Sequence, residues 1–373
     1  MPIRVALIGT GNIAVANHLP GIALCRDATV TALCDANPAA LNAASQMSGI
    51  SATWTDPDVL LREADIDAVI IATPNKAHRH LAVTAVQRGL HVLCEKPLAM
   101  TVDEARQMVE AAERAGVRHM TAFTYRFVPT MNYLRHLVTS GAIGTPWHFR
   151  AQRFQDWGRR AIGWRQRLSE AGSGEVGDML SHRLDFAHSV IGPIARVTAQ
   201  THQIWATRLD DGGKEHESDT EDWVGCLAQF ERGTTGVFES VKTATGYAGD
   251  TTSRDWCEVN GSEGGVAYEL SQPLRIRVAR KGAAYETLDV PAEFRKIPGS
   301  PRDPDANPYQ AFRYDQDFEF IEAIHAGRPC VPSFVDGLRA QIVMEAIIRS
   351  AREQRTVDVP QLEKVAGSKG RRV

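Results

Sequence analysis

The chain has 373 residues, of which 43% are hydrophobic and 23% charged, and this length and composition predict two domains with cores of their own. Its formal net charge of -3 gives no general electrostatic support for a nucleic-acid partner or an anionic membrane surface. The six cysteines are scattered and form no CxxC pair, so we expect neither disulfides nor a metal site.

A glycine turn follows the first predicted strand, residues 3–8. The apolar run IRVALI is typical of a parallel strand that is buried on both faces. In the next segment, GTGNIA, Gly9, Gly11 and Ala14 occupy the small-residue positions of the GxGxxG/A dinucleotide fingerprint. Gly9 would permit the tight turn, Gly11 would let the backbone approach a pyrophosphate, and Ala14 would let the helix lie close to the strand.

Asp35 ends the second predicted strand, residues 29–34, at about the distance from the glycine turn that dinucleotide-binding proteins use. Its carboxylate is placed to accept hydrogen bonds from the adenosine ribose or, alternatively, to cap the helix after Pro38. It would also repel a 2′-phosphate, and residues 36–40 supply no arginine or lysine to bind one. The pattern therefore predicts NAD rather than NADP.

Strand and helix signals alternate as far as residue 123, which is the pattern of a doubly wound parallel sheet. Further strands are predicted at 67–72, 90–94 and 117–123, and helices at 77–88 and 101–115. We therefore predict an α/β Rossmann domain over residues 1–123.

The second half is predicted to be an α+β domain over residues 124–365. After a helix at 176–191, strands follow one another without helices between them, which indicates a large, open, mostly antiparallel sheet. These strands are predicted at 195–206, 222–230, 235–241 and 255–259, with a hairpin loop at 208–220 and closing helices at 309–326 and 336–353. Residues 366–373 are predicted to form a flexible tail.

Two strand ends of the first domain carry polar side chains, in the segments ATPNKAH (72–78) and CEKP (94–97). Ligands bind at the carboxyl ends of the strands in open α/β sheets, so these segments should face the dinucleotide. Pro97 restricts Lys96 to an extended backbone, which suits an ammonium group that stabilises charge on a substrate oxygen. The alternative is a surface lysine paired with Glu95.

The predicted helix at 176–191 places three titratable side chains on one face, because Asp178, His182 and Asp185 follow an i, i+4, i+7 spacing. A carboxylate one turn from an imidazole would fix its tautomer and raise its basicity, as a general base for an alcohol proton requires. The alternative is a hydrogen-bonded or solvated helix face. The glycine-rich approach AGSGEVG favours the catalytic interpretation, because small residues let a ligand come close.

Taken in order, these segments resemble those of the Gfo/Idh/MocA family, named for glucose-fructose oxidoreductase, inositol dehydrogenase and the rhizopine-catabolism protein MocA. The resemblance runs from GTGNIA and ATPNKAH through GLHVLCEKPLAMTVDEARQMVEAA and YRFVP to DMLSH and AIHAGRPCVPSFVDGLRAQIVMEAIIRSA, and EKP is its most specific part. It implies an amino-terminal Rossmann domain with the nicotinamide over EKP. It also implies a carboxy-terminal domain whose open sheet mediates oligomerisation, with a sugar or cyclitol bound between the domains.

The resemblance also implies residue roles. Lys96 matches the family lysine near the reacting oxygen, and Asp178 and His182 match its Asp-x-x-x-His pair, with the histidine as acid and base and the aspartate as its partner. Many members have glycine where this chain has Leu180, which alters the fine geometry around the substrate but keeps the catalytic side chains. The residues expected to contact NAD are Gly9, Gly11, Asn12, Ile13, Asp35, Thr73, Pro74, Asn75, His78, Glu95 and Lys96. The residues expected to contact the substrate are Lys96, Tyr125, Arg126, Arg159, Arg160, Trp164, Arg165, Asp178 and His182.

Arginines are dense between residues 150 and 183, around the predicted site helix, although the chain is acidic overall. They include Arg159, Arg160 and Arg165, interleaved with Trp157 and Trp164. Guanidinium groups suit carboxylate, phosphate or sulfonate groups, so we expect a negatively charged substrate. The alternative is that at least half of these arginines are solvated or paired with acids.

The main hypothesis is an NAD-dependent oxidoreductase that transfers hydride between the nicotinamide and a secondary alcohol of a sugar, sugar acid or cyclitol. Its alternative is an NAD-dependent glycosidase that acts by transient oxidation, elimination, hydration and re-reduction on an anionic glycoside, with Asp185, His188 or a tyrosine as second base. A non-catalytic NAD sensor is a third hypothesis, against which Lys96, Asp178 and His182 argue.

The partners and compartment follow from the same features. We expect a homodimer or homotetramer formed through the second sheet, and no nucleic-acid or membrane partner. No apolar stretch approaches the length needed to span a bilayer, and the first strand begins too close to Met1 to leave room for a signal peptide. We therefore expect a cytoplasmic protein.

Overall fold

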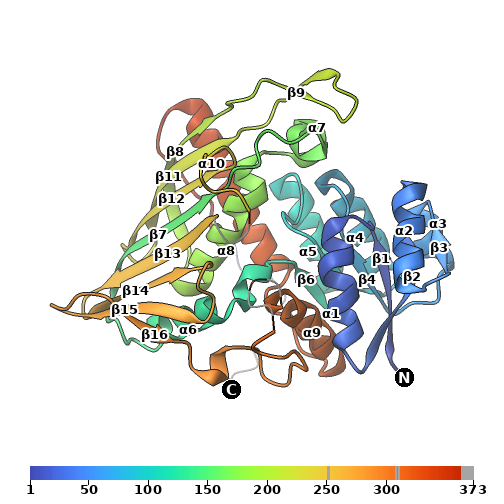
Figure 1. Cartoon of the computed structure of the whole chain (residues 1–373), viewed down its shortest axis with the longest axis horizontal. Coiled ribbons are helices and arrows are strands. Elements are labelled where there is room, and N and C mark those ends of the chain that lie inside the picture. The colour runs from blue at the N-terminus through green and yellow to red at the C-terminus, as the bar shows by residue number, and fades with distance from the viewer. Residues whose placement is uncertain (250–252, 307–308, 310, 363–373) are drawn as a thin grey trace.

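Two sheets organise the part of the chain that the computed structural model describes, residues 1–249, 253–306, 309 and 311–362 (Figure 1). The first sheet has the order β3-β2-β1-β4-β5-β6, and its neighbouring strands are parallel. Its strands are β1 (Ile3–Ile8), β2 (Ala28–Cys34), β3 (Thr53–Trp54), β4 (Ala68–Ile71), β5 (His91–Cys94) and β6 (His119–Thr121). This is the predicted Rossmann sheet. The tail predicted at 366–373 lies outside the described residues.

Local sequence explains where the helices of this domain begin and end. The helices are α1 (Leu19–Leu24), α2 (Pro38–Ser48), α3 (Pro57–Glu63), α4 (His78–Gln87) and α5 (Val102–Ala115). The side chains of Asn37, Asp56 and Thr101 cap α2, α3 and α5 by accepting hydrogen bonds from backbone N–H groups of the first turn. Gly116 ends α5 in the left-handed conformation, with a φ of 67°. A π-helical turn, Ala14–His18, precedes α1.

The second sheet has the order β16-β15-β14-β13-β7-β12-β11-β8-β17 within the described residues. Its neighbours are antiparallel except β7 and β12, which are parallel, so the predicted open and mostly antiparallel sheet is confirmed. Its strands are β7 (Pro146–Phe154), β8 (Ile194–His202), β11 (Trp223–Phe230), β12 (Thr235–Val241), β13 (Arg254–Gly261), β14 (Gly264–Glu269), β15 (Arg275–Arg280), β16 (Glu286–Asp289) and β17 (Val357–Asp358). The predicted hairpin loop carries two short paired strands, β9 (Thr207–Leu209) and β10 (Glu215–Glu217).

The helices of the second domain are α6 (Pro129–Thr139), α7 (Leu168–Ala171), α8 (Ser181–Val190), α9 (Phe312–His325) and α10 (Phe334–Glu353). Figure 1 shows α8 and α10 between the large sheet and the first domain, and both contact the inner face of that sheet. In β11, Val224 and Cys226 point into this core, whereas Leu227 points outward. The helix predicted at 176–191 is divided into a π-helical turn, Val176–Leu180, and α8.

The two closing helices return to the first domain. Helix α9 packs against α1, and α10 packs against α5. Phe320 and Ile321 of α9 belong to the same apolar core as Val5 and Leu7 of β1. The core of the Rossmann domain therefore includes side chains from the end of the chain.

The remaining general features concern cysteines, metals and membranes. The six cysteines all lie among the described residues, where they are buried as free thiols. In the same residues, no group of three or more His, Cys, Asp or Glu side chains is arranged to hold a metal ion. No helix in the described part of the chain is both long and apolar enough to cross a membrane.

Candidate active site

The glycine turn after β1 is shaped to let a ligand approach the backbone. Gly9 has a φ of +92°, and a Cβ there would collide with the carbonyl oxygen of Ala72, so only glycine fits. A Cβ added at Gly11 would meet no described atom within 4 Å, which leaves open space in front of the helical turn that begins with Asn12 and Ile13. Backbone N–H groups at such a turn favour anions, so these residues fit the pyrophosphate of NAD.

Asp35 is bonded to the glycine turn. Its Oδ2 accepts hydrogen bonds from the backbone nitrogen of Thr10 at 2.7 Å and from the hydroxyl of Thr10 at 3.0 Å. Its Oδ1 accepts from the backbone nitrogen of Asn37 at 2.8 Å. Asn37 caps the following helix, α2, so the capping role considered as an alternative for Asp35 belongs to Asn37.

A buried imidazole ties the ends of β4 and β5 together. His78 Nδ1 lies 3.0 Å from the carbonyl oxygen of Pro97, and Nε2 lies 3.1 Å from that of Thr73. Burial lowers the pKa of His78, so the ring is neutral and carries one proton for these two contacts. Asn75 Nδ2 donates to the carbonyl oxygen of Ala171 at 2.8 Å, which joins this strand end to the second domain.

Glu95 belongs to a buried ion-pair chain that the sequence analysis missed. His18 Nε2 lies 3.2 Å from Oε1 of Glu95, and His18 Nδ1 lies 2.8 Å from Oδ1 of Asp317 in α9. Burial alone would lower the pKa of His18, but the two carboxylates raise it to about 10, so the ring is charged at neutral pH. Asp317 is 299 positions further along the chain, and no local pattern links the two residues.

Lys96 and Asp178 form the central ion pair of the site. Lys96 Nζ donates to Oδ1 of Asp178 at 3.0 Å and to the carbonyl oxygen of Asp178 at 2.6 Å. The Nε of Arg165 lies 3.5 Å from the same carboxylate oxygen. Burial alone would raise the pKa of Asp178, but these cations hold it well below its usual range, so the carboxylate is ionised. The Lys96 ammonium thus bonds to the second domain and not to Glu95.

His182 is a buried, neutral imidazole next to this pair. Its ring centre lies 4.6 Å from that of Tyr125 in an edge-to-face contact. Burial and the positive charge of Lys96 lower the pKa of His182 well below its usual value. The expected contact with Asp178 is not made, because that carboxylate is bonded to Lys96, and Nδ1 of His182 has no hydrogen-bond partner in the described structure. The physical reason is the π-helical turn Val176–Leu180, which alters the angular spacing expected from a regular α-helix.

A small cleft lies beside Asp178. It joins the strand ends of the first domain to the glycine-rich segment of the second. Its lining residues are Asn75, Pro97, Trp164, Arg165, Ala171, Ser173, Gly174, Asp178 and Lys242.

The arginines predicted to bind an anion are not all at this cleft. Arg165 lines it and stacks on Trp164, with the guanidinium carbon 4.3 Å from the ring centre. Arg159 and Arg160 are exposed, and their guanidinium groups lie over other indole rings, at 5.5 and 5.6 Å. The alternative of solvated arginines therefore describes these two residues.

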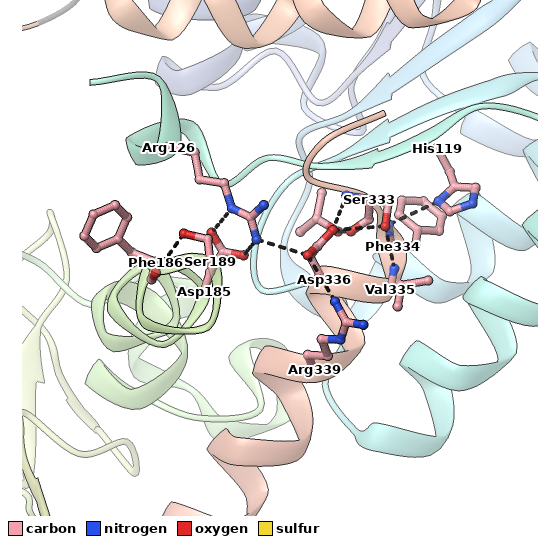
Figure 2. Close-up of polar contacts among 11 residues, drawn as sticks. His119, Arg126, Asp185, Phe186, Ser189, Ser333, Phe334, Val335, Asp336 and Arg339 are labelled. Atoms are coloured by element: carbon pink, nitrogen blue, oxygen red, sulfur yellow. Dashed lines mark hydrogen bonds and ion pairs between the residues drawn. The ribbon is translucent and has the colours of Figure 1, made fainter. Parts of the chain in front are cut away.

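Arg126 lies in a different, buried cluster. Figure 2 shows it between Asp185 of α8 and Asp336 of α10. Its Nε and one terminal nitrogen donate to the two oxygens of Asp185 at 2.7 and 2.5 Å, and the same terminal nitrogen donates to Asp336 at 3.1 Å. These bonds give Arg126 a structural role, and its expected contact with the substrate stays a prediction. The same ion pair with Arg126 holds Asp185, which was considered above as the second base of a glycosidase.

Two titratable groups near Asp178 were not predicted. Lys242 follows β12, and its Nζ lies 3.3 Å from Oδ1 of Asp222. Glu175 is buried and accepts a hydrogen bond from the hydroxyl of Ser240 at 2.5 Å, and burial together with the charge of Asp178 raises its pKa to about 7. A lysine after a strand and a glutamate among glycines match no site motif, so only the tertiary fold identifies them.

The fold and these side chains define a class of protein, the NAD-binding oxidoreductases that combine a Rossmann domain with an α+β domain. Residues 3–123 match the oxidoreductase family with an NAD-binding Rossmann fold. Residues 131–267 match the GFO/IDH/MocA C-terminal domain. The chain belongs to the Gfo/Idh/MocA family.

Characterised dehydrogenases are similar to this chain over most of its length. The levoglucosan dehydrogenase of Pseudarthrobacter phenanthrenivorans is 30% identical over 356 residues, which cover 88% of this chain and 89% of that protein. The inositol 2-dehydrogenase of Rhizobium meliloti is 27% identical over 366 residues, which cover 96% of this chain and all of that protein. The solved structure of levoglucosan dehydrogenase in complex with NADH and levoglucosan matches with a TM-score of 0.88 at 28% identity, covering 97% of this chain and 100% of that one. The predicted family, fold class and cofactor NAD are thereby confirmed.

Proposed function

We propose that this protein is an NAD-dependent dehydrogenase that oxidises a secondary alcohol of a sugar, sugar acid or cyclitol. The observation that carries the proposal is the grouping of Lys96, Asp178 and a neutral His182 beside a dinucleotide-binding sheet. Relatives named as dehydrogenases of levoglucosan, D-apiose and inositol support this substrate class. When bound, NAD supplies the hydride acceptor.

The chain's own residues have distinct tasks in this proposal. His182 takes the proton of the substrate hydroxyl, because only the neutral ring accepts a proton and its lowered pKa keeps the ring neutral at physiological pH. Lys96 binds the reacting oxygen and stabilises the negative charge that develops on it. Asp178 positions the Lys96 ammonium through the 3.0 Å hydrogen bond.

The dehydrogenase is favoured over the glycosidase alternative. A glycosidase of this kind needs a second base close to the reacting sugar. Asp185 is held by Arg126 through two hydrogen bonds, and relatives that match most of this chain are named as dehydrogenases. We therefore propose net oxidation of the substrate.

A negative charge on the substrate is part of the proposal. Arg165 supports it, because this guanidinium lines the cleft, its side chain is 45% exposed, and Asp178 lies at 3.5 Å, beyond ideal hydrogen-bond distance. A planar guanidinium in this position has N–H groups left for an oxyanion.

Assembly and compartment complete the proposal. Leu227 and Val237 are paired across β11 and β12 on the outer face of the second sheet, and they are 60% and 43% exposed. Exposed apolar side chains of this kind favour burial against a second copy, which supports a homodimer or homotetramer through this sheet. The free cysteines suit a reducing compartment, so we place the enzyme in the cytoplasm.

Net reduction of NAD tests the proposed reaction. The purified protein is incubated with NAD and a panel of aldoses, uronates and cyclitols, and NADH is measured by its absorbance. We expect NADH to form in amounts equal to the oxidised product. Cleavage of a chromogenic glycoside without accumulation of NADH would instead establish the glycosidase.

A further inference from the structure

We propose that Lys242 is a substrate-binding residue and that, together with Arg165, it binds a carboxylate of the substrate at a point away from the carbon that is oxidised. This inference rests on the proposed dehydrogenase function. Within that function it selects one substrate class, the sugar and cyclitol acids.

The backbone around Lys242 is fixed at the edge of the cleft. The residue follows the last position of β12, and its backbone nitrogen donates to the carbonyl oxygen of Asp222 at 3.1 Å. Its own carbonyl oxygen accepts from the backbone nitrogens of Trp157 and Gly158 at 3.0 and 2.7 Å. The side chain is 1% exposed and lines the cleft beside Asp178. The ammonium is therefore held in place before any ligand arrives.

The ion pair with Asp222 does not by itself offset the cost of burying the Lys242 ammonium. Oδ1 of Asp222 accepts a hydrogen bond from Arg208 at 2.7 Å, and Oδ2 accepts from the backbone nitrogens of Ile204 and Trp205 at 2.8 and 2.9 Å. Arg208 thus already neutralises this carboxylate, and Lys242 approaches it only to 3.3 Å. The Trp157 ring, whose centre lies 5.6 Å from Nζ, gives Lys242 a cation–π contact but no negative charge. A buried ammonium whose paired carboxylate is shared with an arginine is costly, which favours a negatively charged ligand that uses it.

Positive charge exceeds negative charge at the cleft. Lys96, Arg165 and Lys242 all lower the pKa of the single carboxylate of Asp178. Asp222 is paired with Arg208, and Glu175 is only partly ionised at neutral pH, because burial and Asp178 raise its pKa to about 7. A negative charge on the substrate would offset this excess.

A carboxylate fits this pair of cations better than a phosphate. Its two oxygens can accept from one ammonium and one guanidinium at the same time. A phosphate carries a charge of about -1.5 to -2 and three acceptor oxygens, and Lys242 and Arg165 alone would leave part of it unpaired. Lys96 and His182 remain available for the hydroxyl that is oxidised.

The experiment compares wild type with Lys242→Met, which keeps the length of the side chain and removes its charge. Lys242→Arg is the conservative variant. Lys281→Met is the matched control, because Lys281 is 68% exposed and pairs with Glu263 at 3.4 Å. The probes are D-glucuronate and D-galacturonate, their parent sugars, and the same sugars with a phosphate in place of the carboxylate. Turnover is followed by NADH formation, and binding by the fluorescence of enzyme-bound NADH during titration with each probe.

We expect Lys242→Met to raise the KM and the Kd for a uronate roughly 10- to 100-fold, as for loss of a hydrogen bond to a charged group. Its values for the parent sugar should stay within about 2-fold of wild type, as should all values for Lys281→Met. Lys242→Arg should recover part of the uronate binding. NADH affinity reports whether each variant is folded.

Three results would overturn the inference: equal losses for uronate and parent sugar, no loss for either, or a preference of wild type for the phosphorylated sugars. The proposed function is judged separately. If wild type binds uronates through Lys242 without reducing NAD, the dehydrogenase proposal fails and the carboxylate site stands. If neutral sugars are oxidised and Lys242→Met leaves the binding of uronates unchanged, the dehydrogenase proposal stands and the carboxylate site fails.

Discussion

Replacing Arg126 by methionine should destabilise the protein strongly. In the cluster of Figure 2, Arg126 is 8% exposed and Asp185 is 1% exposed, and two hydrogen bonds of 2.7 and 2.5 Å join them. Methionine fills much of the same volume but leaves the Asp185 carboxylate buried without its partner. The Asp336 carboxylate is destabilised less, because it keeps hydrogen bonds from the backbone nitrogen and hydroxyl of Ser333.

The expected loss is about 3 to 5 kcal/mol in the free energy of unfolding, the usual cost of removing one partner of a buried pair. At about 2 to 4 °C per kcal/mol, the Tm should fall by roughly 6 to 20 °C. The loss should be smaller in acid, because the pKa of Asp185 is already raised to about 6 by burial and a protonated carboxyl needs no cation. Lowering the pH from 7 to about 6 should return up to about 1.4 kcal/mol, and the difference should then level off because Asp185 is protonated in both proteins.

Urea unfolding followed by tryptophan fluorescence measures this loss at two pH values. Asp185→Asn combined with Arg126→Met should be less destabilising than the sum of the single changes, because the double variant buries no unpaired charge at this position. Arg196→Met is the control for an exposed pair, since Arg196 is 55% exposed and lies 3.4 Å from Asp358, and it should change stability by less than about 1 kcal/mol. A stable Arg126→Met protein with a raised KM would refute the reasoning and support Arg126 as a substrate contact.

Four further predictions follow from the site. Lys96→Ala and His182→Ala should each lower kcat roughly 10²- to 10⁴-fold in steady-state assays with NADH affinity nearly unchanged, and a near-normal kcat would remove the assignment. The acid limb of kcat/KM should lie below pH 6.5, since burial and Lys96 lower the pKa of His182; a midpoint above that value would contradict a neutral base. Replacing Asp35 by Ser and Ala36 by Arg should shift the ratio of NADP to NAD affinity by about 1 to 3 kcal/mol toward NADP, and equal Kd values for both cofactors in wild type would speak against the role of Asp35. Glu175 has its pKa raised to about 7, so its contribution to the free energy of unfolding is complete below pH 4.5 and lost as the pH rises to 7. Compared with Glu175→Gln in chemical denaturation, wild type should lose roughly 3 kcal/mol over this range, and parallel stability curves would show that the group does not titrate there.

The Rossmann half could be predicted from sequence because its signals are local. Strands such as β1 and β4 are buried on both faces, so they are continuous apolar runs, and their helices end at recognisable caps and glycines. Strand β7 was missed for the opposite reason. It points Arg153 into the core, where that arginine pairs with Asp255 in β13, so the strand does not alternate apolar and polar residues.

The candidate site shows the same limit. Lys96 and His182 could be proposed from motifs, because each lies at the end or on the face of a predictable element. The ion pair between Asp178 and Lys96 could not be predicted in this way. A π-helical turn leaves no mark in the pattern of residues, and the Lys96 ammonium comes from the other domain. Lys242 is a single charged residue after a strand, and only the paired register of β11 and β12 brings it to the cleft.

The return of helix α9 to the first domain has a consequence for synthesis on the ribosome. The amino-terminal sheet emerges first, but the apolar surface that Phe320 and Ile321 cover stays bare until nearly the whole chain has been translated. Asp317, one of the two carboxylates that pair with His18, is also translated late. Until then His18 lacks this counterion. The nascent Rossmann half therefore exposes part of its apolar core during translation, and it reaches its final packing only after the last helices have been released.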